Sequence, residues 1–214
     1  MIWPYVFDGI GALVVSSALD PEQLVDKIDR HSGTGALSWI APKVTGLDTG
    51  GDSEVKHAIN VWRGLGLHVG GWIYNIEPKA DVASLDPWRD LLDFVIYDVE
   101  RPYKEDETPG GYAKAAELVA RTPANGSVAV TSYGAIPGYG NQPSTIDFGS
   151  FARAGWPIFA QLYDGYTHPV EETYALDSGQ KFPGPYPREG LHQLVRSLTL
   201  QPGMAVYRPE GIDG

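Results

Sequence analysis

The chain contains no cysteine, and this absence removes several classes of chemistry. Disulfide bonds, thiolate nucleophiles and zinc sites built on sulfur are all excluded. Basic residues are also scarce, since 16 Lys and Arg stand against 27 Asp and Glu, for a formal net charge of −11. A surface of this sign repels nucleic acid, so we expect no nucleic-acid partner.

Long apolar runs are missing too. None approaches the roughly 20 residues of a membrane-spanning helix, so we expect a soluble protein without membrane insertion. The apolar stretch 10–19 has no Lys or Arg before it and is closed by Asp20 and Pro21, which is not the pattern of a signal peptide. Action outside a cell or on a virion would therefore need another carrier, and the sequence leaves the compartment open.

The amino-acid composition is that of an ordinary globular protein, with 43% hydrophobic and 20% charged residues. That composition argues against disorder and against a coiled coil. No internal repeat or low-complexity tract interrupts the 214 residues. We therefore predict that residues 1–214 form one domain with one sizeable core.

Short apolar runs rich in Val, Ile, Tyr and Trp alternate with segments of helical period, which is typical of an α/β fold with parallel strands. The predicted strands are 5–7, 37–40, 67–74, 94–99, 128–133, 158–163 and 204–207, with 13–16 as an extension of the first. Seven or eight strands are near the number of a TIM-like (β/α) barrel. We predict an irregular barrel of this kind with an incomplete outer ring of helices.

Helices are predicted between these strands. Asp20-Pro21 and Asp86-Pro87 each combine an N-cap acid with a proline suited to the first turn. Apolar residues at three- and four-residue steps predict helices over 55–65, 111–121 and 191–198. The segment 165–187, rich in Gly, Pro and Tyr, is too long for an ordinary connection, and we interpret it as a substrate-facing loop.

The sharpest local feature is the segment 93–100, an apolar strand that ends in Asp98-Val99-Glu100. Side chains two apart on a strand point the same way, about 6.6 Å apart along the backbone, so the two acids share a face. In a barrel, catalytic groups gather at this carboxyl end of the strands. Two neighbouring carboxylates can divide the roles of proton donor and anion. The alternative is that both are solvated loop residues paired with Arg101.

Two further aspartates follow predicted strands in the same way. Asp8 comes after 5–7 and is a candidate third carboxylate of the site, with a turn-forming role as the alternative. Asp164 follows 158–163, where a plain loop role is the alternative to contact with substrate.

Aromatic residues recur at the same strand ends, and aromatic rings cover the apolar faces of sugar rings. This common position predicts a glycan cleft, with core packing as the alternative for any single ring. The aromatic residues that we expect to contact substrate are Trp72, Tyr74, Tyr133 and Tyr163.

Other chemistries find no support. The histidines have no metal-site spacing and no serine stands in a nucleophile elbow, so we expect neither a metal nor another cofactor. Asp48-Thr49-Gly50 matches the triplet of aspartic proteases, but those enzymes need a second such loop in a β-rich fold.

With Asp8 after the first strand, Asp98-Val99-Glu100 after a middle strand and the run 69–74 between them, the chain resembles family 25 glycoside hydrolases, lysozymes of the N-acetylmuramidase type. The resemblance covers most of the chain and extends through Ser132-Tyr133-Gly134 and Gln161-Leu162-Tyr163. Its specific element is Asp-x-Glu. The length of the chain suits that family's irregular barrel of about eight strands.

The resemblance implies a hydrolase of peptidoglycan, with Glu100 as general acid, Asp98 as its partner carboxylate, Asp8 lining the cleft and Gln161 contacting substrate. Glu100 would protonate the leaving oxygen while Asp98 or the acetamido group of the substrate steadies the sugar cation, as in retaining glycosidases. Such enzymes are common among bacteriophage lysins and virion-associated wall hydrolases. Other virion proteins are therefore candidate partners.

The sequence also departs from the family pattern, which usually includes a further aspartate on the last strand. Asp213 and Asp164 are the candidates for that position. If neither serves, the alternatives are a glycosidase with another glycan substrate, or a non-catalytic glycan-binding barrel in a phage tail or surface assembly. A barrel of the chitinase sort is a weaker option, because the Asp-x-x-Asp-x-Asp-x-Glu run is absent.

Overall fold

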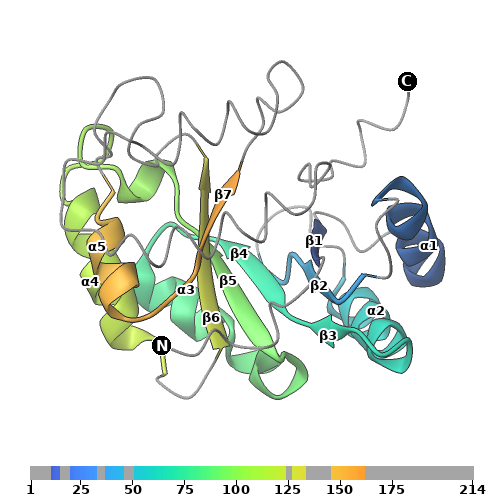
Figure 1. Cartoon of the computed structure of the whole chain (residues 1–214). Helices are drawn as coiled ribbons and strands as arrows, with labels where there is room; N and C mark the ends of the chain where they lie inside the picture. The colour runs from blue at the N-terminus through green and yellow to red at the C-terminus, as the bar shows by residue number, and fades with distance from the viewer. Residues whose placement is uncertain are drawn as a thin grey trace.

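The computed structural model describes residues 11–14, 20–32, 37–45, 51–123, 127–133 and 146–161. Strands and helices alternate along these ranges (Figure 1). The elements are β1 (Gly11–Val14), α1 (Pro21–Ser32), β2 (Trp39–Pro42), α2 (Asp52–Gly64), β3 (His68–Val69), β4 (Gly71–Tyr74), α3 (Pro78–Ser84), η2 (Asp86–Leu91), β5 (Phe94–Asp98), η3 (Arg101–Tyr103), α4 (Gly111–Arg121), β6 (Ser127–Tyr133), α5 (Phe148–Arg153) and β7 (Ile158–Gln161).

The strands form two parallel sheets, and this corrects the predicted barrel. One sheet has the order β1-β2-β3 and the other has the order β4-β5-β6-β7. Every pair within them is parallel, as the α/β pattern predicts. Within the described residues no pairing joins β7 to β1, so the sheets stay open and the prediction of a closed TIM-like barrel is wrong for them. The predicted strands 5–7 and 204–207 and the predicted helix 191–198 lie outside the described residues.

The division into two sheets falls inside the run 67–74, which the sequence predicts as one strand. His68–Val69 pairs with β2, whereas Gly71–Tyr74 pairs with β5. Between them lies Gly70, where a Cβ atom would stand 2.1 Å from the Phe94 ring. The chain therefore changes partner where only glycine fits against this ring. A parallel bridge between Lys43 and Trp72 still connects the two sheets.

Gly70→Ala is predicted to destabilise the protein by about 1–3 kcal/mol, because the added methyl must displace a buried ring. Urea unfolding measures the effect. Gly64→Ala is the matched control, since a Cβ there meets nothing within 4 Å. Equal stability of the two variants would contradict the proposed packing at Gly70.

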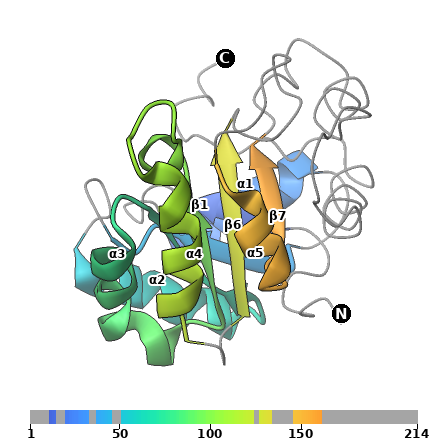
Figure 2. The same cartoon turned by 90° about the vertical axis from the view of Figure 1, so that its left-hand side faces the viewer.

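Helices cover one face of the sheets. In Figure 2 helices α3, α4 and α5 lie in front of the four-stranded sheet. Helices α1 and α2 lie beside the three-stranded sheet (Figure 1). Tyr97 of β5 stacks on Trp156, which in turn stacks on Phe151 of α5, with ring centroids 5.7 Å apart in both pairs. Trp62 of α2 donates from Nε1 to the Pro21 carbonyl at the start of α1. Large side chains thus join α5 to β5 and α2 to the start of α1.

The opposite face carries a second apolar cluster that runs across both sheets. We call it the inner cluster, and its buried members are Trp39, Ala41, Trp72, Phe94, Ile96 and Ala129. Trp39 and Phe94 meet edge to face at 5.5 Å. Strands of a parallel sheet are buried on both faces, which explains their continuous apolar runs.

Helix starts follow the predicted signals in part. Asp20 Oδ1 accepts from the N–H groups of Glu22 and Gln23, both at 3.0 Å, so the cap of α1 is confirmed. Asp86-Pro87 begins the six-residue 3-10 helix η2 and not an α-helix. The predicted helix 111–121 is confirmed as α4.

Among the described residues, no helix has the length and apolar character that crossing a bilayer requires.

Candidate functional site

The predicted carboxylates lie at the carboxyl end of β5. Asp98 is the last residue of that strand and is only 7% exposed, so it is not the solvated loop residue of the alternative interpretation. Val99 is fully buried among the residues that face the helices. Alternation along the chain therefore directs Asp98 and Glu100 to the other side, where the inner cluster lies. Glu100 is partly buried and precedes η3.

Neighbouring strand ends surround this pair. Asp98 stands in register with Tyr74 of β4 and with Thr131 of β6. The backbone N–H of Asn75 donates to the Asp98 carbonyl, and that of Val99 donates to the Thr131 carbonyl, both at 2.9 Å. The carboxyl end of β5 is thus fixed from both sides.

The hydroxyl of Tyr74 lies close to the negative charges of the site. Burial raises the pKa of its hydroxyl, and the negative charges of Glu100 and then Asp98 raise the pKa further. Arg101 acts in the opposite direction and is itself ion-paired to Glu107 at 3.0 Å. The hydroxyl of Tyr74 therefore lies in the field of both carboxylates. It stays protonated past the ordinary tyrosine pKa of 10.0 and remains a hydrogen-bond donor.

Trp72, a predicted sugar contact, belongs to the inner cluster and is only 8% exposed. Its Nε1 donates to the Val14 carbonyl at 2.9 Å, which ties β4 to β1. We give this indole a packing role beneath the site, with Tyr74 two residues further on at the rim.

Lys43 is a charged neighbour that the sequence did not single out. It follows β2, and its Nζ lies 5.4 Å from the centre of the Trp72 ring. Trp39 and Ala41 are members of the inner cluster, so the two-residue period places Lys43 on the same face. This two-residue period is the sequence signal that could have identified Lys43. The edge therefore combines one ammonium group with two carboxylates and a tyrosine hydroxyl.

The remaining predicted residues are placed only in part. Tyr133 and Gln161 end β6 and β7 and stand in register with each other, which brings their backbones to the same carboxyl edge as Asp98. Asp8, Tyr163, Asp164 and Asp213 lie outside the described residues. The predicted third and fourth carboxylates therefore stay predictions.

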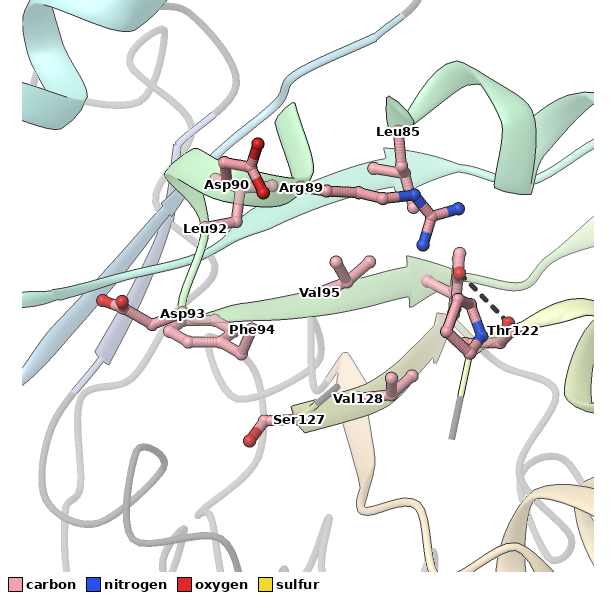
Figure 3. Close-up of a pocket in the computed structure, with 12 residues that line it drawn as sticks. Leu85, Arg89, Asp90, Leu92, Asp93, Phe94, Val95, Thr122, Ser127 and Val128 are labelled. Atoms are coloured by element: carbon pink, nitrogen blue, oxygen red, sulfur yellow. Dashed lines mark hydrogen bonds between the residues drawn. The ribbon is translucent and has the colours of Figure 1, made fainter. Parts of the chain in front are cut away.

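A pocket of about 460 Å³ lies at the opposite edge of the sheet, where β5 and β6 begin (Figure 3). Its wall combines apolar side chains such as Leu85 and Val128 with Arg89, Asp90 and Asp93. Arg89 is already ion-paired to Asp86, and Asp93 pairs with Arg63, both at 2.7 Å. Two of these three charged groups thus already have ion-pair partners, and we keep the carboxyl edge as the candidate site.

No protein-family model matches the chain, and the comparison with curated proteins found no significant match. The resemblance to family 25 glycoside hydrolases therefore stays a prediction from the Asp-x-Glu element. Within the ranges that the structure describes, no three His, Asp or Glu side chains come together as a metal site.

Proposed function

We propose that the chain is a glycoside hydrolase that cuts bacterial cell-wall polysaccharide, with Glu100 as general acid and Asp98 as the partner carboxylate. The supporting observation is the placement of Asp98 at the carboxyl end of β5 with Glu100 two residues further on, where the charges of both act on the Tyr74 hydroxyl. Two carboxylates that act on one hydroxyl at the end of parallel strands suit an acid and an anion working on the same bond.

In this mechanism Glu100 gives its proton to the leaving oxygen while the bond from that oxygen to the anomeric carbon breaks. The carboxylate of Asp98, or the acetamido group of the substrate, steadies the positive charge on the sugar ring. Water then adds to the anomeric carbon and returns a proton to Glu100. Tyr74 donates a hydrogen bond to a sugar hydroxyl.

The direct test is digestion of purified peptidoglycan, followed by measurement of new reducing ends and by mass spectrometry of the released fragments. Release of disaccharide-peptide fragments with a reducing-end amino sugar supports the proposal. Firm binding to insoluble walls without new reducing ends would instead support the non-catalytic glycan-binding alternative.

Tyr74→Phe is predicted to lower turnover by about three- to tenfold, which corresponds to the free energy of one neutral hydrogen bond. Because the pKa of Tyr74 is raised above 10.0, the hydroxyl does not lose its proton in the neutral range. The variant should therefore be slower by the same factor at every pH from about 4 to 8. A loss confined to one end of this range would contradict the assigned role.

A further inference from the structure

Asn75, Asp81 and Tyr103 form a polar cluster next to the carboxyl end of β5. Asn75 and Tyr103 are both fully buried. The Asn75 Nδ2 donates to Asp81 Oδ2 at 3.2 Å, and the same oxygen accepts from the N–H groups of Ile76 and Glu77, both at 2.9 Å. Asp81 thus fixes the amide of Asn75 with its oxygen turned away.

Asn75 Oδ1 and Tyr103 Oη are an acceptor and a donor, and neither has a hydrogen-bond partner elsewhere among the described residues. Their side chains interact with each other: burial and the charge of Asp81 raise the pKa of Tyr103, whereas hydrogen bonding to the Asn75 side chain lowers it. The amide of Asn75 therefore joins Asp81 on one side to Tyr103 on the other.

The same cluster holds the backbone on both sides of the carboxylate pair. Before the pair, the N–H of Asn75 donates to the Asp98 carbonyl at 2.9 Å. After the pair, the N–H of Tyr103 donates to the Glu100 carbonyl, also at 2.9 Å. The segment from Asp98 to Glu100 is thus held by the backbone of two residues whose buried side chains interact with each other.

We propose that Asn75 and Tyr103 are positioning residues, which set the direction of the Glu100 carboxyl relative to Asp98 and Tyr74 through this backbone segment. The proposal rests on the assignment of Glu100 as the general acid. Small misplacements of a reacting group are costly, since about 1 Å can lower the rate a hundredfold. Neither residue needs to touch the substrate to control the rate.

Tyr103→Phe tests this role because it removes only the hydroxyl. Because the change leaves the buried ring and the backbone hydrogen bonds in place, the variant should remain folded, with a urea midpoint no lower than that of Tyr97→Phe. Its kcat on peptidoglycan should nevertheless fall about tenfold or more with little change in KM. Asn75→Ala should lower kcat similarly, and the double variant should lose no more than the larger single loss.

Tyr97→Phe is the matched control. Tyr97 is also a buried tyrosine, one residue from Asp98, but its hydroxyl bonds to Thr122 Oγ1 at 3.1 Å on the helix-covered face. This variant should lose stability and keep its kcat. Unchanged kcat in Tyr103→Phe, or equal losses of kcat in both tyrosine variants, would overturn the positioning role.

A second readout needs no turnover. The carboxyl carbon of Glu100, followed by nuclear magnetic resonance during a pH titration, should change its midpoint in Tyr103→Phe and not in Tyr97→Phe. An unchanged midpoint in Tyr103→Phe would overturn the positioning role even if the enzyme is active. A wild type without turnover would refute the proposed hydrolase, and the titration alone would then decide whether the cluster positions Glu100.

Discussion

Glu100→Gln is expected to lower the release of reducing ends from wall glycan by at least about a hundredfold, the low end for loss of a general acid. Glutamine keeps the shape of the side chain and can still hydrogen-bond, but it has no proton to transfer. Binding to insoluble peptidoglycan should therefore survive. Circular dichroism and urea unfolding should show a folded protein, because Glu100 is only partly buried.

Glu107→Gln is the control for this experiment. Glu107 lies a few residues further on and accepts from Arg101 and Lys104 at 3.0 and 2.8 Å. Its replacement removes one negative charge near the edge without touching the proposed chemistry, so turnover should remain. Activity that persists in Glu100→Gln would refute Glu100 as the acid, and equal losses in both variants would point to a general effect of charge.

Asp98→Asn is expected to lower turnover by about a hundredfold to a thousandfold, the range found when one preorganised electrostatic group is removed. The amide has the size of the carboxylate but no negative charge to steady the sugar cation. The variant should still be folded, as circular dichroism would show, because the amide fits the space of the carboxylate.

Asp93→Asn is the matched control, since it makes the same change at the other end of the same strand. Asp93 pairs with Arg63 at 2.7 Å and accepts from the Val69 N–H at 2.8 Å. This variant should lose stability and keep its turnover. The reverse pattern, with stability lost in Asp98→Asn and turnover lost in Asp93→Asn, would move the chemistry to the pocket edge of the sheet.

Elements with a local signal were predictable from the sequence. Helix α4 has an apolar stripe and a proline just after its end, and its predicted bounds agree with the structure. Strand β5 is an apolar run bounded by acids. Helices α3 and α5 were missed, because seven and six residues are too few to establish a helical period.

Features that depend on contacts far apart in the chain were not predictable. The division of the run 67–74 depends on the fit of Gly70 against the Phe94 ring, which no local pattern contains. Closure of a barrel depends on pairing between the first and last strands. Strand number suggested such pairing, and the described strands do not form it.

The candidate site could likewise be predicted only in part. Parity along β5 was enough to direct Asp98 and Glu100 to one face, and strand polarity put them at the carboxyl edge. The contact of Tyr103 with Asn75 joins residues 28 positions apart and appears only in the folded chain. Sequence alone therefore suggested the candidate carboxylates but not the polar cluster formed by Asn75, Asp81 and Tyr103.

The central claim is that the chain hydrolyses a glycosidic bond, and digestion of purified peptidoglycan in water enriched in heavy oxygen tests it most directly. Hydrolysis adds the oxygen of water to the anomeric carbon. The account predicts that mass spectrometry finds one heavy oxygen at each new reducing end with the wild type, and no such product with Glu100→Gln. Fragments without the label, or no fragments from a folded wild type that binds the wall, would contradict it.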